Sequence, residues 1–87
     1  MVTKQLINKC LYLLNKHCRY NNVSYGVHNY ISYISTSIYI WDNLKKFDSE
    51  IIESFSETIH NDEDFNELEY KIVNFIKQNK EKIGEKI

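Results

Sequence analysis

The chain is poor in the residues that interrupt regular structure. Its 87 residues include no proline and only two glycines, Gly26 and Gly84. Because proline and glycine are the strongest local breakers of helices and strands, their scarcity predicts long elements with short connections. No apolar run approaches the roughly 18 residues that a membrane helix needs. The first residues also lack the apolar core of a secretory signal. We therefore expect a cytoplasmic protein that does not bind membranes.

Cysteine is scarce as well, since only Cys10 and Cys18 are present. On one helix, eight residues span about 12 Å, which is beyond the reach of a disulfide. There is no CxxC pair, and His17, His28 and His60 fall at irregular intervals, so no zinc-binding pattern is formed. The sequence predicts reduced cysteines inside a helix, no metal site and no cofactor.

Motifs of catalysis are also missing. The chain has no glycine-rich phosphate loop, no HExxH pair and no calcium-binding loop. His17 and Cys18 are adjacent, so on a helix their side chains point about 100° apart and do not form a nucleophile–base pair. We expect no enzymatic activity and assign no catalytic residue.

Apolar residues recur at helical spacing at the start of the chain. Thr3 is a suitable N-cap for a helix that runs to about Arg19. Basic residues in the last turn suit the negative end of the helix dipole. The stripe predicted to face the core consists of Leu6, Ile7, Cys10, Leu11, Leu14 and Cys18.

Residues 21–26 are expected to form a loop, and the segment that follows fits two structures. Residues 34–40 alternate in the manner of a strand, with isoleucine and threonine at every second position. We favour a long buried helix because a helical period runs on towards Leu44, and because a lone strand would have no partner. The residues that keep this period are Val27, Ile31, Ile34, Ile38 and Trp41.

Two further helices are expected in the second half of the chain. Asp48 or Ser49 is a suitable N-cap for one, and Asn61 or Asp62 for the other. Their predicted inner faces consist of Ile51, Ile52, Phe55 and Ile59, and of Phe65, Leu68, Ile72 and Phe75 or Ile76. Together with the first two helices, they predict an all-α fold, a compact four-helix bundle that forms a single domain over residues 1–87.

Negative charge is concentrated in residues 48–69, which hold nine of the 12 carboxylates and neither lysine nor arginine. Caps and the helix dipole account for only some of these carboxylates. Because no i,i+4 pair inside the segment relieves the repulsion, we expect a docking surface for a basic partner, with a merely solvated acidic face as the alternative. The predicted partner-binding residues are Glu53, Glu57, Asp62, Glu63, Asp64 and Glu67, with Phe65 and Tyr70 as anchors.

This pattern resembles the helical immunity proteins of bacteriocin and contact-dependent-inhibition nuclease toxins, in particular those of the colicin D type. The likeness covers size, helix order, the motif Lys45-Lys46-Phe47-Asp48 before an acidic turn, and a final helix with Ile72-Val73-Asn74-Phe75-Ile76-Lys77. It implies an inhibitor that covers the basic cleft of a cognate nuclease toxin, a tRNase, without touching nucleic acid itself. Such a protein would be a monomer or a weak homodimer.

Other interpretations stay open. A phage-type inhibitor that mimics nucleic acid would look similar. The N-terminal half carries lysines and Arg19 among aromatic residues, which fits a small helical nucleic-acid-binding regulator, although the pI near 6.3 is not that of a strongly basic protein. The tyrosine-rich residues 30–41 would suit a self-association surface.

Overall fold

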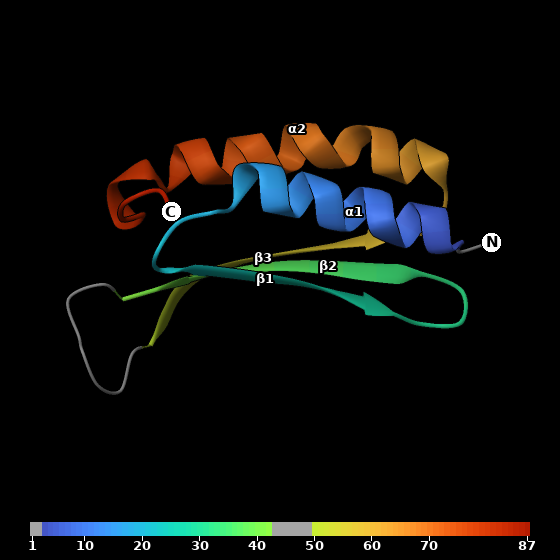
Figure 1. The fold of residues 1–87 in the computed structure, drawn as a ribbon, viewed down its shortest axis with the longest axis horizontal. Helices are drawn as coiled ribbons and strands as arrows, with labels where there is room; N and C mark the ends of the chain where they lie inside the picture. Colours follow the sequence, from blue (N-terminus) through green and yellow to red (C-terminus); the bar gives the residue numbers. More distant parts are fainter. Residues whose placement is uncertain (1–2, 43–49) are drawn as a thin grey trace.

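Two helices and a three-stranded sheet make up the described part of the chain. The computed structural model describes residues 3–42 and 50–87. The strands form one antiparallel sheet in the order β1-β2-β3, and Figure 1 shows both helices on the same side of it. The elements in chain order are α1 (Lys4–His17), β1 (Val23–Asn29), β2 (Ile34–Trp41), β3 (Ile51–Ile59), α2 (Asp62–Gln78) and the short 3-10 helix η1 (Lys80–Lys82).

The prediction of an all-α four-helix bundle is therefore wrong, and the fold is a two-layer α+β arrangement. Most of the residues expected in the second helix form β1 and β2, and β1 already begins inside the expected loop. Those expected in the third helix form β3. The N-cap expected at Asp48 or Ser49 and the motif at 45–48 lie outside the described residues.

The segment forms the strand β2 and not a helix because it has partner strands. β1 and β3 pair with it on either side, both antiparallel. Alternate side chains of a strand point to the same face of a sheet, and β-branched residues pack well there. The row of β2 that faces the helices is fully buried and consists of Ile34, Thr36, Ile38 and Ile40.

The strand character of β3 is hidden by two glutamates in its helix-facing row. Glu53 pairs in register with Ile40, and Glu57 with Thr36, so both belong to the inner face of the sheet. They are tolerated there because β3 is an edge strand and lysines meet them. With polar residues in the inner row, the apolar positions that remain mimic a helical spacing.

The first and last helices are confirmed, together with their caps. The Thr3 hydroxyl accepts a hydrogen bond from the Leu6 N–H at 3.1 Å. The Asn61 side chain accepts one from the Asp64 N–H at 3.0 Å. The last helix ends at Gln78. Within the described residues, no helix is long and apolar enough to cross a membrane.

The core lies between the helices and the inner face of the sheet. Side chains from α1, β2, β3 and α2 meet there without exposure to solvent. Both cysteines are part of it and are unpaired thiols, as expected. The completely buried members are Cys10, Leu14, Cys18, Ile34, Ile38, Ile59, Leu68 and Ile72.

Residues 84–87 return to the end of α1 and pair with the connection between α1 and β1. Tyr20 and Lys86 form an isolated antiparallel bridge. On one side of it the Asn21 N–H donates to the Glu85 carbonyl at 2.9 Å, and on the other the Ile87 N–H donates to the Arg19 carbonyl at 3.0 Å. This contact places Lys86 beside the end of α1.

Asn22 locks this arrangement through a side chain that is only 6% exposed. Its amide nitrogen donates to the carbonyls of Trp41 at 2.9 Å and Lys82 at 2.8 Å. Its amide oxygen accepts from the Gly84 N–H at 2.8 Å. One side chain thus joins the end of β2 and the segment after α2 to the start of β1.

Candidate anion-binding site

Basic side chains gather at one end of the molecule, where both helices end. α1 and α2 run in the same direction (Figure 1), so their C-terminal ends lie together. The last turn of α1 carries Lys16 and His17, and that of α2 carries Lys77. Cations in these positions are favoured by the negative end of the helix dipole. The dipoles do not account for Lys86, which the pairing of residues 84–87 brings to the same place.

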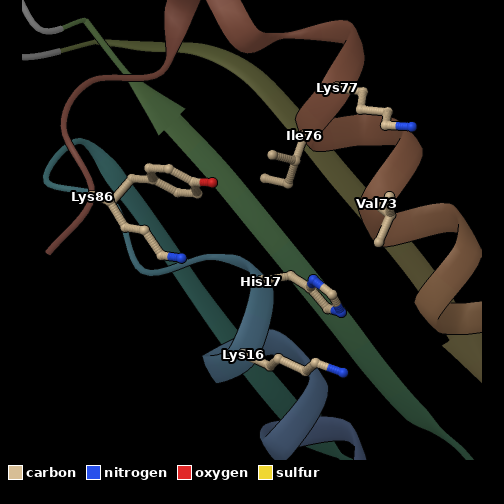
Figure 2. A pocket seen from close by; sticks show the side chains of 7 residues that line it. Lys16, His17, Val73, Ile76, Lys77 and Lys86 are labelled. Atoms are coloured by element: carbon tan, nitrogen blue, oxygen red, sulfur yellow. The ribbon is translucent and has the colours of Figure 1, made fainter.

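These basic residues line a pocket of about 150 Å³, which we call the cationic pocket. Figure 2 shows the lining side chains coming from three segments, α1, α2 and the segment that carries Lys86, with the end of Lys77 directed away from His17 and Lys86. Its remaining walls are apolar or aromatic. The complete lining is Lys16, His17, Tyr20, Val73, Ile76, Lys77 and Lys86.

A single carboxylate, that of Glu69, meets two of these groups. Its Oε2 accepts a hydrogen bond from Nε2 of His17 at 2.7 Å and lies 3.4 Å from Nζ of Lys16. The bond from His17 and the charge of Lys16 hold the pKa of Glu69 below its ordinary value. Within the described ranges Lys77 and Lys86 form no ion pair. The cationic pocket therefore keeps an excess of positive charge.

A second, more apolar pocket adjoins the first. It has a volume of about 210 Å³ and is lined by Tyr20, Ile76, Lys80, Ile83 and Gly84. Because Tyr20 and Ile76 line both pockets, the two lie side by side. Only together do they reach the lower end of the roughly 300–1,000 Å³ typical of small-molecule sites. The pair of pockets suits a ligand with an anionic group and an uncharged body.

The thiol next to His17 in the chain is buried and unreactive. Burial raises the pKa of the Cys18 thiol to about 12, so this neighbour of His17 stays protonated and is a poor nucleophile. Across the described segments, no three histidine, cysteine or acidic side chains come together as metal ligands. The expectation that the protein is not an enzyme stays a prediction.

The acidic residues predicted to bind a partner fall into two groups. The first belongs to the sheet edge and is paired within the molecule. Glu53 lies 2.7 Å from Nζ of Lys82, and Glu57 lies 2.8 Å from Nζ of Lys71. Lys71 also lies 3.8 Å from Glu67. The counter-charges that the acidic segment lacks therefore come from α2 and η1, just beyond it.

The second group surrounds the first turn of α2, at the other end of the molecule from the cationic pocket. Asp64 accepts a hydrogen bond from the His60 N–H at 2.8 Å, which holds the pKa of Asp64 below its ordinary value. Asp62 and Glu63 are exposed and have no ion pair among the described residues. Of the two predicted anchors, Phe65 packs against the core, while Tyr70 is 71% exposed.

The residues of the cationic pocket were not predicted as a site. Their only signal in the sequence was the basic last turn of each helix, which has an adequate local explanation. Their convergence depends on two facts that the sequence does not display. The helices run parallel, and Lys86 pairs with Tyr20.

Comparisons with known proteins provide no relative. No family model, no curated protein and no solved structure matches the chain. The resemblance to immunity proteins therefore stays a prediction, and the helix order that entered it differs from the one described above.

Proposed function

We propose that the protein is a non-catalytic binding protein whose ligand carries a phosphate group, held in the cationic pocket. One observation carries this proposal. Lys16, Lys77 and Lys86 come from three separate segments and line one pocket with apolar walls, and among the described residues only Lys16 of the three meets a carboxylate, that of Glu69. An anion seated there would gain charge-assisted hydrogen bonds, which are the stronger kind.

A phosphate group fits this charge better than a carboxylate does. Because Glu69 already opposes Lys16, a single carboxylate would compensate only one of the two remaining lysine charges, whereas a phosphate monoester carries up to two negative charges and three acceptor oxygens. Ammonium groups bind phosphate as point charges and do not require planar geometry. The uncharged body of the ligand would lie against Tyr20 and Ile76, which line both pockets.

Titration calorimetry with pyrophosphate and with adenosine 5′-monophosphate tests the proposal. We expect saturable binding that weakens with salt. Lys86→Gln should weaken it about tenfold or more, because a hydrogen bond to a charged group contributes roughly 1.5–3 kcal/mol.

The matched control is Lys4→Gln. Lys4 is exposed and begins α1, so this variant makes the same change in net charge far from the pocket. If it weakened binding as much as Lys86→Gln, the attraction would be non-specific. Absence of saturable binding of either probe would refute the site. Tighter, Lys86-dependent binding of a DNA or RNA duplex would instead favour a nucleic-acid-binding regulator.

Inhibition of a basic nuclease remains the second candidate. The observation that favours it is the exposure of Asp62 and Glu63, which have no ion pair in the described residues. The charge reversals Asp62→Lys and Glu63→Lys should abolish copurification with the product of an adjacent toxin gene. The reversal Glu81→Lys, on η1, serves as the control.

A further inference from the structure

Among the described residues, no strand pairs with the outer edge of β1, and the strand itself is uncharged. Its seven residues, Val23–Asn29, include no lysine, arginine, aspartate or glutamate. Unpaired edge strands are templates for pairing with another strand, and natural proteins usually protect them with charges or irregularities.

Two hydrogen bonds identify which backbone groups of β1 are free. The Trp41 N–H donates to the Asn22 carbonyl, and the Tyr30 N–H donates to the Tyr33 carbonyl. Hydrogen-bonded pairs alternate along an antiparallel ladder, so the even-numbered residues of β1 bond to β2. The backbone groups of Tyr25, Val27 and Asn29 consequently point away from the sheet. In the described part of the chain they have no other backbone partner.

The opposite edge is protected. On β3, Glu53 and Glu57 form ion pairs with Lys82 and Lys71. A strand approaching that edge would have to disturb these pairs, whereas one approaching β1 meets no charge on the strand itself. The β1 edge of the sheet is therefore more accessible to an additional strand than the β3 edge.

Helical spacing places a partly exposed leucine on the flank of α1 that faces β1. Asn15 of α1 accepts a hydrogen bond from the Tyr25 hydroxyl at 2.8 Å, so this flank of α1 faces β1. Leu11 lies one turn before Asn15 on the same flank and is 41% exposed. The opposite flank contacts α2 through Lys16 and Glu69. An apolar side chain is therefore available just above the unpaired strand.

We propose that two copies of the protein pair through β1, antiparallel and centred on Gly26, to form a continuous six-stranded sheet. In this register the seven-residue strands overlap completely. Tyr25 of one copy then forms a hydrogen-bonded pair with Val27 of the second copy, and each uses the backbone groups that point outward. Gly26 lies opposite Gly26 of the second copy, and Leu11 is covered by α1 of that copy.

A second copy fits this edge because the strand is complementary to itself. Its inner row pairs Tyr25 with a valine, and no like charges on the strands face each other. The central pair has no side chains, and close approach of two backbones is one reason for a glycine inside a strand. The single chain gives no such reason, because a Cβ added at Gly26 would meet nothing within 4 Å. The proposal is independent of the anion site.

The test is sedimentation equilibrium of the full chain over a range of concentrations. The wild-type protein should shift reversibly from one to two copies as the concentration rises. Gly26→Lys should abolish this shift, because the two lysines would lie directly opposite each other across the seam. The variant should still fold, since the side chain enters open space, and circular dichroism verifies this.

Ser56→Lys is the matched control. Ser56 pairs with Ser37, which pairs with Gly26, so it lies in the same cross-strand row at the protected edge. This variant should dimerise like the wild type. A wild-type protein that remains one copy at every concentration overturns the proposal. Equal disruption by both variants also overturns it, because the contact would then be the outer face of the sheet.

Discussion

Asn22 shows how much of the architecture one polar side chain can hold. Its amide uses both donor and acceptor groups on segments that are distant in sequence. Buried amides with satisfied hydrogen bonds specify a unique arrangement, whereas an unsatisfied buried group costs roughly 1–3 kcal/mol. Asn22 is therefore a positioning residue for both pockets, although it lines neither.

Replacing Asn22 by aspartate keeps the shape and removes the donor. In Asn22→Asp a carboxylate would face the carbonyls of Trp41 and Lys82, so we expect the free energy of unfolding to fall by roughly 3 kcal/mol or more. Anion binding should weaken in the fraction that stays folded. Chemical denaturation and calorimetry measure the two effects. Asn21→Asp, with an exposed side chain, should change stability little. Similar losses in both variants would contradict this role.

The two thiols were expected inside a helix, and this holds for Cys10, whereas Cys18 lies directly after the end of α1. The sequence placed Cys10 and Cys18 on the apolar stripe of the first helix, and both have no exposed surface. Burial raises the pKa of Cys10 to about 11 and that of Cys18 to about 12. Both thiols therefore stay protonated at neutral pH.

At the scale of elements, helices were predictable and strands were not. A helix can be recognised from local features, such as the cap at Thr3 and an apolar stripe at helical spacing. A strand depends on partners elsewhere in the chain. The alternation of residues 34–40 was visible, but β1 contains Gly26 and begins among asparagines. β3 carries Glu53 and Glu57 on its inner face. Because neither neighbouring strand is recognisable in the sequence, the alternation of residues 34–40 alone does not identify a strand.

The N-terminus of α2 provides a quantitative test at this scale. Asn61→Ala removes the cap acceptor of the Asp64 N–H, and loss of such a cap costs about 1 kcal/mol. For a domain of this size the melting temperature should fall by about 4–8 °C. Asn66→Ala is the matched control within the same helix, at an exposed position. It should raise the melting temperature slightly, because alanine is the better helix former. A fall in both variants would contradict the capping role.

At the scale of the whole molecule, the candidate site could not be predicted from the sequence. Lys16 and Lys77 are local features of helix ends, but their distance from each other is set by parallel packing over one sheet. The acidic segment, by contrast, was conspicuous in the sequence and is partly neutralised in space by Lys71 and Lys82. Charge that is isolated along a chain need not be isolated in the folded protein.

The contact between the two helices should make stability depend on acid pH. The pKa of Glu69 is lowered in the folded protein, chiefly by its hydrogen bond from His17. The unfolded chain therefore takes up this proton at a higher pH than the folded chain does. The contribution of Glu69 is fully present above its ordinary pKa of 4.5 and is lost as the pH falls through the lowered value.

Thermal unfolding of Glu69→Gln between pH 7 and pH 3 measures this contribution. The variant should be less stable than the wild type at neutral pH, and the difference should shrink towards pH 3. Glu81→Gln, at an exposed position of η1, should follow the wild type throughout. A constant difference between Glu69→Gln and the wild type at all pH values would show that packing, and not charge, is what Glu69 supplies.

The pairing of Tyr20 with Lys86 affects the stage of folding at which the two pockets form. It joins residues 20 and 86 of an 87-residue chain, and contacts of such large separation are slow to form because a long loop must close. The two pockets are therefore completed only after most of the chain between Tyr20 and Lys86 is ordered. A bound anion would slow the opening of this contact and raise the melting temperature with its concentration. A chain lacking residues 84–87 would lose Lys86 and the Gly84 partner of Asn22, and it should no longer bind the ligand.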